Sequence, residues 1–252
     1  MRNPWDGEIV AKTISVVGID LDGTLLELSD QFIAQYLLKV DQWVASRLRM
    51  EPVLAKAIWE TTVWACSLDH GPTLLEDAFF ERLCSLIKIS REDIKEVFQM
   101  FYQEVFPELQ RLSHPIVGAM GFLTQIQALG LKVVLLTSPV FPRIAIDERL
   151  RWAGIEGFPF DWISSLEVVH AAKPHPAYYL GAAKTLDIAP SNWLMVGNDL
   201  EQDIRPARVT GMHTWWVSDG RFDYAVPDED VLKGPLHDVI PYLKAHSSLA
   251  IE

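Results

Sequence analysis

Short apolar runs alternate with helical patterns along most of the chain. The runs are rich in aliphatic and β-branched residues, which is typical of strands buried in a sheet. They predict five strands, over residues 13–19, 131–137, 162–164, 193–196 and 213–217. Apolar residues at helical spacing predict helices over 176–186 and 201–210, the second ending at Gly211. Strands that alternate with helices predict an α/β fold with a parallel sheet.

One long insert interrupts this alternation. About 110 residues separate the first two predicted strands, far more than one crossover helix needs. Helical periodicity continues through the gap. Its first apolar face comprises Ile33, Leu37, Val40, Val44 and Leu48. We therefore expect an inserted α-helical subdomain over residues 27–114, and a core formed by residues 1–26 and 115–252.

Local signals predict where elements of the insert begin and end. Thr73 and Glu76 form a capping-box pattern, and Ser90 is placed to cap the following helix. The turn at residues 70–73 is expected to connect two helices, although it could also face a bound substrate. Serine and proline within residues 113–115 suit a hinge back to the sheet.

Charge and composition exclude several classes of partner. The chain of 252 residues has 22 Lys and Arg against 34 Asp and Glu, a formal net charge of −12. This charge repels polyanions and argues against nucleic acid or anionic membranes as partners. We find no signal-peptide pattern and no apolar run of membrane-spanning length, and Cys66 and Cys84 form no metal or redox motif. We therefore expect a cytoplasmic protein, with its oligomeric state left open.

Two acidic residues follow the first predicted strand. Asp20 and Asp22 are separated by one residue, so they point to the same side if the strand continues, and Gly23 permits a sharp turn. Buried carboxylates at a strand end are costly unless they are paired, protonated or bound to metal. Taken alone, the segment could also be an acidic turn between a strand and a helix.

Three more polar segments are placed at the edge where ligands bind in open parallel sheets. Thr137 and Ser138 follow the second strand, and their hydroxyls could hydrogen-bond an anion. Lys173 precedes a helix and could hold a phosphoryl oxygen. Asp199 ends the fourth strand and Asp203 lies one helical turn later. Each segment also has a plain structural interpretation, as a strand-end turn, a surface lysine or an acidic helix N-terminus.

In this order the four segments resemble the motifs of the haloacid dehalogenase-like (HAD) hydrolase superfamily. Its motifs are Asp-x-Asp-Gly-Thr/Ser after a strand, Thr or Ser after an apolar strand, a lysine often followed by proline, and an acidic pair after a strand. The matching residues are Asp20 to Thr24, Thr137, Lys173, and the pair Asp199 and Asp203. One departure is Ser138, which stands where the family often has Asn.

The resemblance implies a Rossmann-like core with the first strand at the centre of the sheet. It also implies a mobile cap, and an insert between the first and second motifs resembles the family's C1 type of helical cap. Only 35 residues separate Thr137 from Lys173, which argues against a second large cap.

By resemblance, Asp20 is the nucleophile that attacks phosphorus. Asp22 is then the general acid that protonates the leaving oxygen and the base that activates water. Mg²⁺ is expected to bind Asp20, the backbone carbonyl of Asp22, and Asp199. The expected substrate is a small phosphorylated metabolite.

The remaining motif residues are expected to support this chemistry. Thr137, Lys173 and Ser138 are assigned to phosphate binding. Asp203 and Asn198 are expected to orient Lys173 or metal-bound water. Gly23 and Thr24 complete the first motif as supporting residues.

We expect Mg²⁺-dependent hydrolysis of a phosphomonoester through an aspartyl-phosphate on Asp20. Alternatives are phosphoryl transfer to an acceptor, as in a phosphotransferase or phosphomutase, and a non-catalytic binding or regulatory protein on the same scaffold. Dehalogenase members typically lack an acid at the position of Asp22, which argues against dehalogenation. Phosphonate cleavage in the family uses a cap lysine, a role that the sequence assigns to none of Lys39, Lys56, Lys88 and Lys95.

Three arginines follow the second motif. We expect most of Arg143, Arg149 and Arg151 to lie on a solvated helix face. Arg143 is close enough to Thr137 in the sequence to contact substrate.

Overall fold

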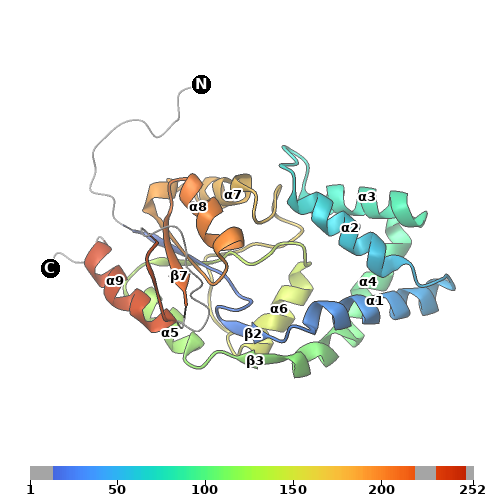
Figure 1. Cartoon of the computed structure of the whole chain (residues 1–252), viewed down its shortest axis with the longest axis horizontal. Helices are drawn as coiled ribbons and strands as arrows, with labels where there is room; N and C mark the ends of the chain where they lie inside the picture. The colour runs from blue at the N-terminus through green and yellow to red at the C-terminus, as the bar shows by residue number, and fades with distance from the viewer. Residues whose placement is uncertain (1–13, 219–230, 248–252) are drawn as a thin grey trace.

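The computed structural model describes residues 14–218 and 231–247, which form an α/β core and a helical insert (Figure 1). A six-stranded sheet runs through the core in the order β5-β4-β1-β6-β7-β8, and neighbouring strands are parallel. The strands are β1 (Val16–Ile19), β4 (Lys132–Leu135), β5 (Trp162–Ile163), β6 (Trp193–Gly197), β7 (His213–Val217) and β8 (Lys233–Gly234). The predicted fold class is confirmed, and the first strand lies between β4 and β6 as expected.

Most differences from the predicted strands lie at their ends. β7 has the predicted bounds, whereas β1 begins at Val16 and β4 stops at Leu135. Thr13, predicted to open the first strand, lies outside the described residues. β8 was not predicted, because two residues are too few to produce a periodic pattern.

Helices cover both faces of the sheet (Figure 1). On one face α5 (Ala119–Ala128) packs against α9 (Val239–His246), and on the other α7 (Pro176–Leu186) packs against α8 (Arg205–Val209). The bounds of α7 match the prediction. The helix predicted over 201–210 is divided instead into a π-helical turn over Leu200–Ile204 and the short α8. The other core helices are α6 (Arg143–Trp152) and 3₁₀ turns at Pro190–Asn192 and Leu236–Asp238, and a further 3₁₀ turn at Phe106–Leu112 ends the insert.

Four helices form the insert, on the side of the core shown at the right of Figure 1. They are α1 (Phe32–Leu48), α2 (Leu54–Cys66), α3 (Leu75–Ile87) and α4 (Arg91–Glu104). The chain enters the insert through β2 (Leu26–Leu28) and returns through β3 (Ser113–Pro115), which pair antiparallel. The predicted boundaries fall within this pair, where Glu27 lies opposite His114. Both connections to the core therefore lie side by side.

The start of α4 is as predicted, and the start of α3 is not. Ser90 Oγ accepts a hydrogen bond from the backbone N–H of Asp93 at 3.1 Å, so it caps α4. The capping box of Thr73 and Glu76 is wrong, because α3 begins at Leu75 without a side-chain cap. The backbone N–H groups of Leu75 and Glu76 donate instead to carbonyl oxygens of core residues 169 and 166, at 2.8 and 3.0 Å. The core thus supplies the acceptors that a capping side chain would provide.

The apolar face of α1 also differs from the prediction. The buried residues are Phe32, Tyr36, Val40 and Val44, while Ile33 is 42% exposed. Phe32 and Tyr36 both pack edge-on against Phe106, with ring centroids 6.2 and 6.1 Å apart. This aromatic packing rotates the buried face of the helix away from Ile33.

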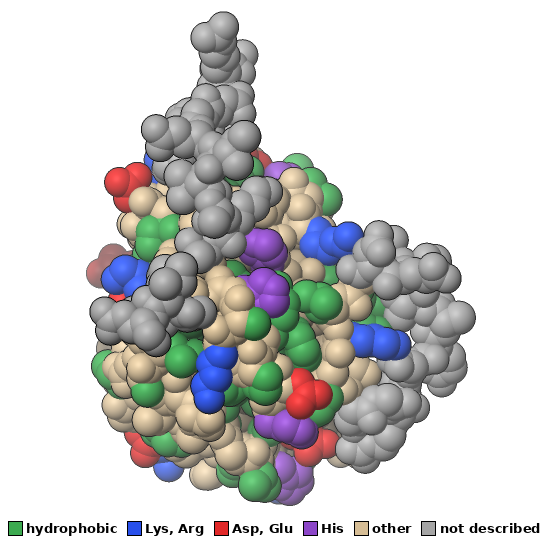
Figure 2. Space-filling model, turned by 90° about the vertical axis from the view of Figure 1, so that its left-hand side faces the viewer, with side chains coloured by type: hydrophobic (Ala, Val, Ile, Leu, Met, Phe, Trp, Pro, Cys, Tyr) green, Lys and Arg blue, Asp and Glu red, His purple; other side chains and the backbone are tan. Residues whose placement is uncertain are grey.

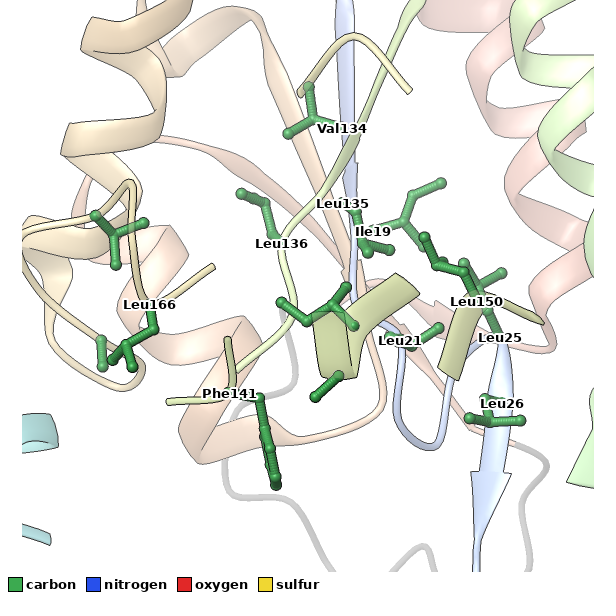
Figure 3. Close-up of a cluster of buried hydrophobic side chains, with 14 of the residues drawn as sticks. Ile19, Leu21, Leu25, Leu26, Val134, Leu135, Leu136, Phe141, Leu150 and Leu166 are labelled. Carbon is green, nitrogen blue, oxygen red and sulfur yellow. The ribbon is translucent and has the colours of Figure 1, made fainter. Parts of the chain in front are cut away.

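Aliphatic side chains fill the space beneath the carboxyl edge of the sheet. Figure 3 shows Ile19 and Leu135 from neighbouring strands together with Leu150 from α6, and all three are buried. The Phe141 ring lies apart from these strand residues in Figure 3 and packs against Tyr36 of the insert, with ring centroids 5.2 Å apart. The edge that carries the candidate site is therefore backed by a packed apolar core.

The surface of the core carries side chains of both charges. On the face of the core turned away from the insert, acidic, basic and hydrophobic side chains are interspersed (Figure 2). Within residues 14–218 and 231–247, we find no helix long and apolar enough to cross a membrane. Cys66 and Cys84 are free and partly buried.

Candidate active site

The candidate site lies at the carboxyl ends of three neighbouring strands. Asp20 follows β1, Thr137 lies beyond β4, and Asp199 lies beyond β6. The side chains of Asp20, Thr137, Lys173 and Asp203 are buried. Because buried polar groups need partners, their contacts define what the site can do.

Lys173 joins two carboxylates in the centre of this site. Its Nζ donates to Asp20 Oδ1 at 2.7 Å and to Asp203 Oδ1 at 2.6 Å. Asp203 Oδ2 accepts from the backbone N–H of Asp199 at 3.1 Å. Lys173 is thus held in one network with Asp20, 153 residues earlier in the chain, and with Asp203, 30 residues later. The contact between Asp203 and Lys173 is the one expected from the sequence.

Burial sets the electrostatics of this network. Desolvation raises the pKa of Asp20 and raises that of Asp203 to about 7, although Lys173 opposes both shifts. Desolvation alone would lower the pKa of Lys173, but the two carboxylates raise it well above its ordinary value. The lysine therefore stays protonated. When both carboxylates are ionised, its single charge leaves an excess negative charge that a further cation would balance.

The oxygen donors present fit a hard divalent cation. Asp20 keeps Oδ2 largely available, with Thr24 Oγ1 at 3.5 Å. Asp199 is exposed and uses Oδ1 to accept from the backbone N–H groups of residues 201 and 202, at 2.8 and 3.0 Å. In the described part of the chain, no three or more His, Cys, Asp or Glu side chains cluster as ligands. Two carboxylates, a backbone carbonyl and water would instead suit magnesium, which retains several waters.

The hydroxyl of Thr137 is an unused buried donor. Thr137 Oγ1 has no hydrogen-bond partner within the described residues. Its backbone carbonyl accepts from Tyr178 Oη at 2.8 Å and Ser164 Oγ at 3.1 Å, which fixes the residue in place. A phosphoryl oxygen would satisfy the free hydroxyl. Ser138 follows and is half-buried.

The turn after Asp20 packs tightly against Asn198. Thr24 Oγ1 donates to Asn198 Oδ1 at 3.3 Å. Gly23 has a φ of +90°, and a Cβ at this position would lie 2.2 Å from Asn198 Nδ2. The supporting residues Gly23, Thr24 and Asn198 therefore form one contact between the ends of β1 and β6.

Gly23→Ala should destabilise the protein more than Gly118→Ala. Both glycines have left-handed backbones, with φ of +90° and +88°, but a Cβ at Gly118 meets nothing within 4 Å. Both substitutions carry backbone strain, and Gly23→Ala must also displace the Asn198 side chain from Thr24, which loses a hydrogen bond worth about 0.5–1.5 kcal/mol. Urea unfolding measures the difference, and equal losses for the two variants would contradict the tight contact with Asn198.

Arg149 is a residue of the site that the sequence analysis missed. Its side chain is 0% exposed, and its Nη1 donates to Asp22 Oδ2. The guanidinium lies 4.6 Å from the centroid of the Phe141 ring. Asp22 Oδ1 and Arg149 Nη2 are buried and have no hydrogen-bond partner among the described residues. Asp22, the expected general acid, is thus held from α6 by a buried arginine.

The prediction of a solvated arginine face is wrong for Arg149 and right for its neighbours. Arg143 pairs with Asp147 at 2.7 Å, and Arg151 pairs with the partly buried Glu148, and both arginines are about half exposed. The expectation that Arg143 contacts substrate stays a prediction. One signal was available for Arg149: it lies four residues after Ala145 and three after Ile146, both buried, so it shares their helix face.

The insert contacts the core close to Lys173. The turn at residues 70–73 does connect two helices, as predicted, and it also lies against core residues 166–171. The backbone N–H of His70 donates to the carbonyl of His170 at 3.1 Å. The Nδ1 of His170 lies 2.9 Å from the carbonyl oxygen of Thr73. With the two bonds at the start of α3, these contacts hold the insert over the segment that leads to Lys173.

Comparison with known proteins places this geometry in context. The family model described as haloacid dehalogenase-like hydrolase matches residues 14–211. The chain is 26% identical to phosphonoacetaldehyde hydrolase from Bacillus cereus over 139 residues, which cover 55% of the chain and 52% of that protein. The chain therefore spans about half the length of the curated relatives that it matches.

Solved structures share the fold across nearly the whole chain. A HAD phosphatase from Thermococcus onnurineus superimposes with a TM-score of 0.58 at 20% identity, covering 93% of this chain and 99% of that one. A 2-haloacid dehalogenase from Pseudomonas syringae pv. tomato DC3000 superimposes with a TM-score of 0.60 at 21% identity, covering 92% and 98%. At these identities the likeness shows the fold alone.

Proposed function

The chain belongs to the haloacid dehalogenase-like hydrolases, and on that premise we propose that it hydrolyses a phosphomonoester through an aspartyl-phosphate on Asp20. One observation carries the proposal: the buried Asp20 carboxylate bonds to the buried Lys173 Nζ at 2.7 Å. Asp22 follows two residues later, and the free hydroxyl of Thr137 lies at the end of the neighbouring strand. A nucleophile, an acid and phosphate-binding groups are therefore available at one edge of the sheet.

In the first step, the Asp20 carboxylate would attack phosphorus. Asp22 would donate its proton to the leaving alcohol oxygen as the P–O bond breaks. Thr137 and Lys173 would bind the phosphoryl oxygens as charge redistributes over them. Asp22 would then take a proton from the water that attacks the aspartyl-phosphate, releasing phosphate and restoring Asp20.

Asp20, Asp199 and the backbone carbonyl of Asp22 would hold Mg²⁺, which supplies positive charge between an anionic nucleophile and an anionic phosphate. Asp203 would orient Lys173. Asn198 would hold the turn at Gly23 and Thr24 in place. Ser138 would contribute to phosphate binding.

The acid at position 22 and the cap lysines favour a phosphate ester over other substrates of the superfamily. A halide leaving group needs no proton, so Asp22 would have no part in dehalogenation. Cleavage of a C–P bond would need an available cap lysine. Lys39 donates to Glu108 at 2.7 Å and Lys95 donates to Glu76 at 2.5 Å, while Lys56 and Lys88 are exposed at the surface of the insert.

Phosphate release from a panel of phosphomonoesters should require Mg²⁺ and Asp199. We expect release with Mg²⁺ and none with chelator. Asp199→Asn should raise the Mg²⁺ concentration for half-maximal activity by about tenfold or more. Even the loss of a residue that only contacts a metal ligand typically lowers metal affinity or activity by about 10–100-fold. Glu201→Gln is the matched control, because that exposed carboxylate pairs with Arg205 on the same turn.

Release that persists in chelator, or an unchanged Mg²⁺ requirement in Asp199→Asn, would overturn the proposed metal site. Release that depends on an added acceptor alcohol would indicate phosphoryl transfer instead of hydrolysis.

A further inference from the structure

A cavity of about 570 Å³ lies between the helices of the insert and the core. We propose that it binds the organic group of the substrate, and that this group is apolar or aromatic and carries no negative charge. The inference rests on the proposed function, because it names the class of phosphomonoester that the site takes. The volume falls in the range of pockets that enclose small ligands, about 300–1,000 Å³.

The wall of the cavity is mainly apolar. Helices α1 to α4 contribute Ile33, Leu37 and Ile58 together with several rings, and the core contributes Val140 and Ile144. The lining rings include Tyr36, Phe79, Phe80, Phe98, Tyr102 and Phe141. Binding of an apolar or aromatic group against such a surface is favourable, because the group is removed from water.

The charged residues around the cavity are mostly acidic. Four glutamates line it, at positions 76, 92, 96 and 167, against a single lysine among the described lining residues, Lys95. That lysine already donates to Glu76 at 2.5 Å. The net charge is therefore negative, and it adds to the −12 of the whole chain. A carboxylate or a second phosphate on the substrate would be repelled, whereas a neutral group is accepted.

The floor of the cavity is built from the same segments as the candidate active site. Val140 and Phe141 belong to the loop that begins after Thr137, and Leu166 belongs to the segment that leads to Lys173. The Phe141 ring lies 4.6 Å from the Arg149 guanidinium, which in turn contacts Asp22. Asp22 itself does not line the cavity, because the Arg149 and Phe141 side chains lie between them. The alcohol portion of the ester would extend from Asp22 past these two side chains into the cavity.

A series of n-alkyl phosphates from methyl to octyl tests the apolar character. We expect kcat/KM to rise by about fourfold for each methylene that enters the cavity, since burying one CH₂ is worth about 0.8 kcal/mol. Phosphoglycolate, which carries a carboxylate, should be hydrolysed about tenfold less efficiently than propyl phosphate, because like charges disfavour binding. Equal efficiency for methyl and octyl phosphate, or a preference for phosphoglycolate, would overturn the inference.

Two neighbouring residues of α2 supply a matched pair of variants. Thr62 lines the cavity, whereas Val63 does not line it and is 53% exposed. Thr62→Trp should lower the ratio of octyl to methyl phosphate efficiency by about tenfold, since it excludes two or more methylenes. Val63→Trp should leave this ratio unchanged. If Thr62→Trp fails to fold, Ile33→Trp narrows the same cavity from an exposed position on α1.

Binding of 1-octanol, measured by calorimetry, separates this inference from the proposed function because it needs no turnover. Binding that is lost in Thr62→Trp and kept in Val63→Trp supports the cavity even if no ester is hydrolysed. Hydrolysis of methyl phosphate without binding of 1-octanol would contradict the proposed role of the cavity but would still support the phosphatase function. Absence of both would overturn both.

Discussion

Asp20→Asn should abolish phosphate release while the protein stays folded. An amide is a poor nucleophile, so turnover through an aspartyl-phosphate should fall by about 10⁴-fold or more, the scale of losing a nucleophile elsewhere. Folding should tolerate the change, because Lys173 keeps Asp203 as a partner at 2.6 Å. The substitution also removes a carboxylate whose pKa is raised by burial. Phosphate release and urea unfolding measure the two effects separately.

Asp203→Asn is the control for Asp20→Asn, because it removes the carboxylate on the other side of the same lysine. Lys173 then keeps Asp20, at 2.7 Å, and the nucleophile is intact. We expect a smaller loss of about 10–100-fold, the usual effect of a residue that orients a functional group. If both variants lose activity to the same extent, Asp20 has no special role, and the covalent mechanism is contradicted.

The sheet could be predicted because its strands are buried on both faces. Residues 213–217, His-Thr-Trp-Trp-Val, form a strand with the predicted bounds, since a continuous apolar run marks such a strand. The pairs β2 with β3 and β7 with β8 escaped prediction because they involve strands of two or three residues, too short for a period. The start of α3 escaped because its hydrogen-bond acceptors come from residues 166 and 169, far away in the sequence.

The acids and Thr137 could be located because each follows an apolar run and parallel strands end at the same edge, whereas Lys173 was located by its place before a helix. The cap cavity could not, because its lining depends on how four helices turn relative to one another. Ile33 illustrates the limit: its spacing predicts burial, but packing of Phe32 and Tyr36 on Phe106 leaves it exposed at the cavity. Arg149 was missed for a related reason. A polar side chain on an apolar helix face is assigned to solvent unless its distant partner is known.

Arg149→Met should lower the activity through its effect on Asp22. Arg149 is a positioning residue, since it holds Asp22 by an ion pair and packs on Phe141 without reaching Asp20 in the structure. Met retains much of the volume but removes the donor. We expect kcat/KM for alkyl phosphates to fall by about 10–100-fold, as for other orienting residues. Because Asp22 is 25% exposed and can be hydrated once it is unpaired, the stability loss should stay near about 1–3 kcal/mol, below that of a fully buried pair.

The leaving group separates this positioning role from a purely structural one. 4-Nitrophenolate leaves without a proton, so 4-nitrophenyl phosphate depends less on a general acid than an alkyl phosphate does. Arg149→Met should therefore impair alkyl phosphates more strongly, and its effect should be less than additive with Asp22→Asn. Arg151 lies on the surface of the same helix, paired with Glu148. Arg151→Met should leave kcat/KM for both esters unchanged and should alter stability by less than about 0.5 kcal/mol. Equal losses for both esters in Arg149→Met, or additive losses with Asp22→Asn, would show that Arg149 supports the fold without positioning Asp22.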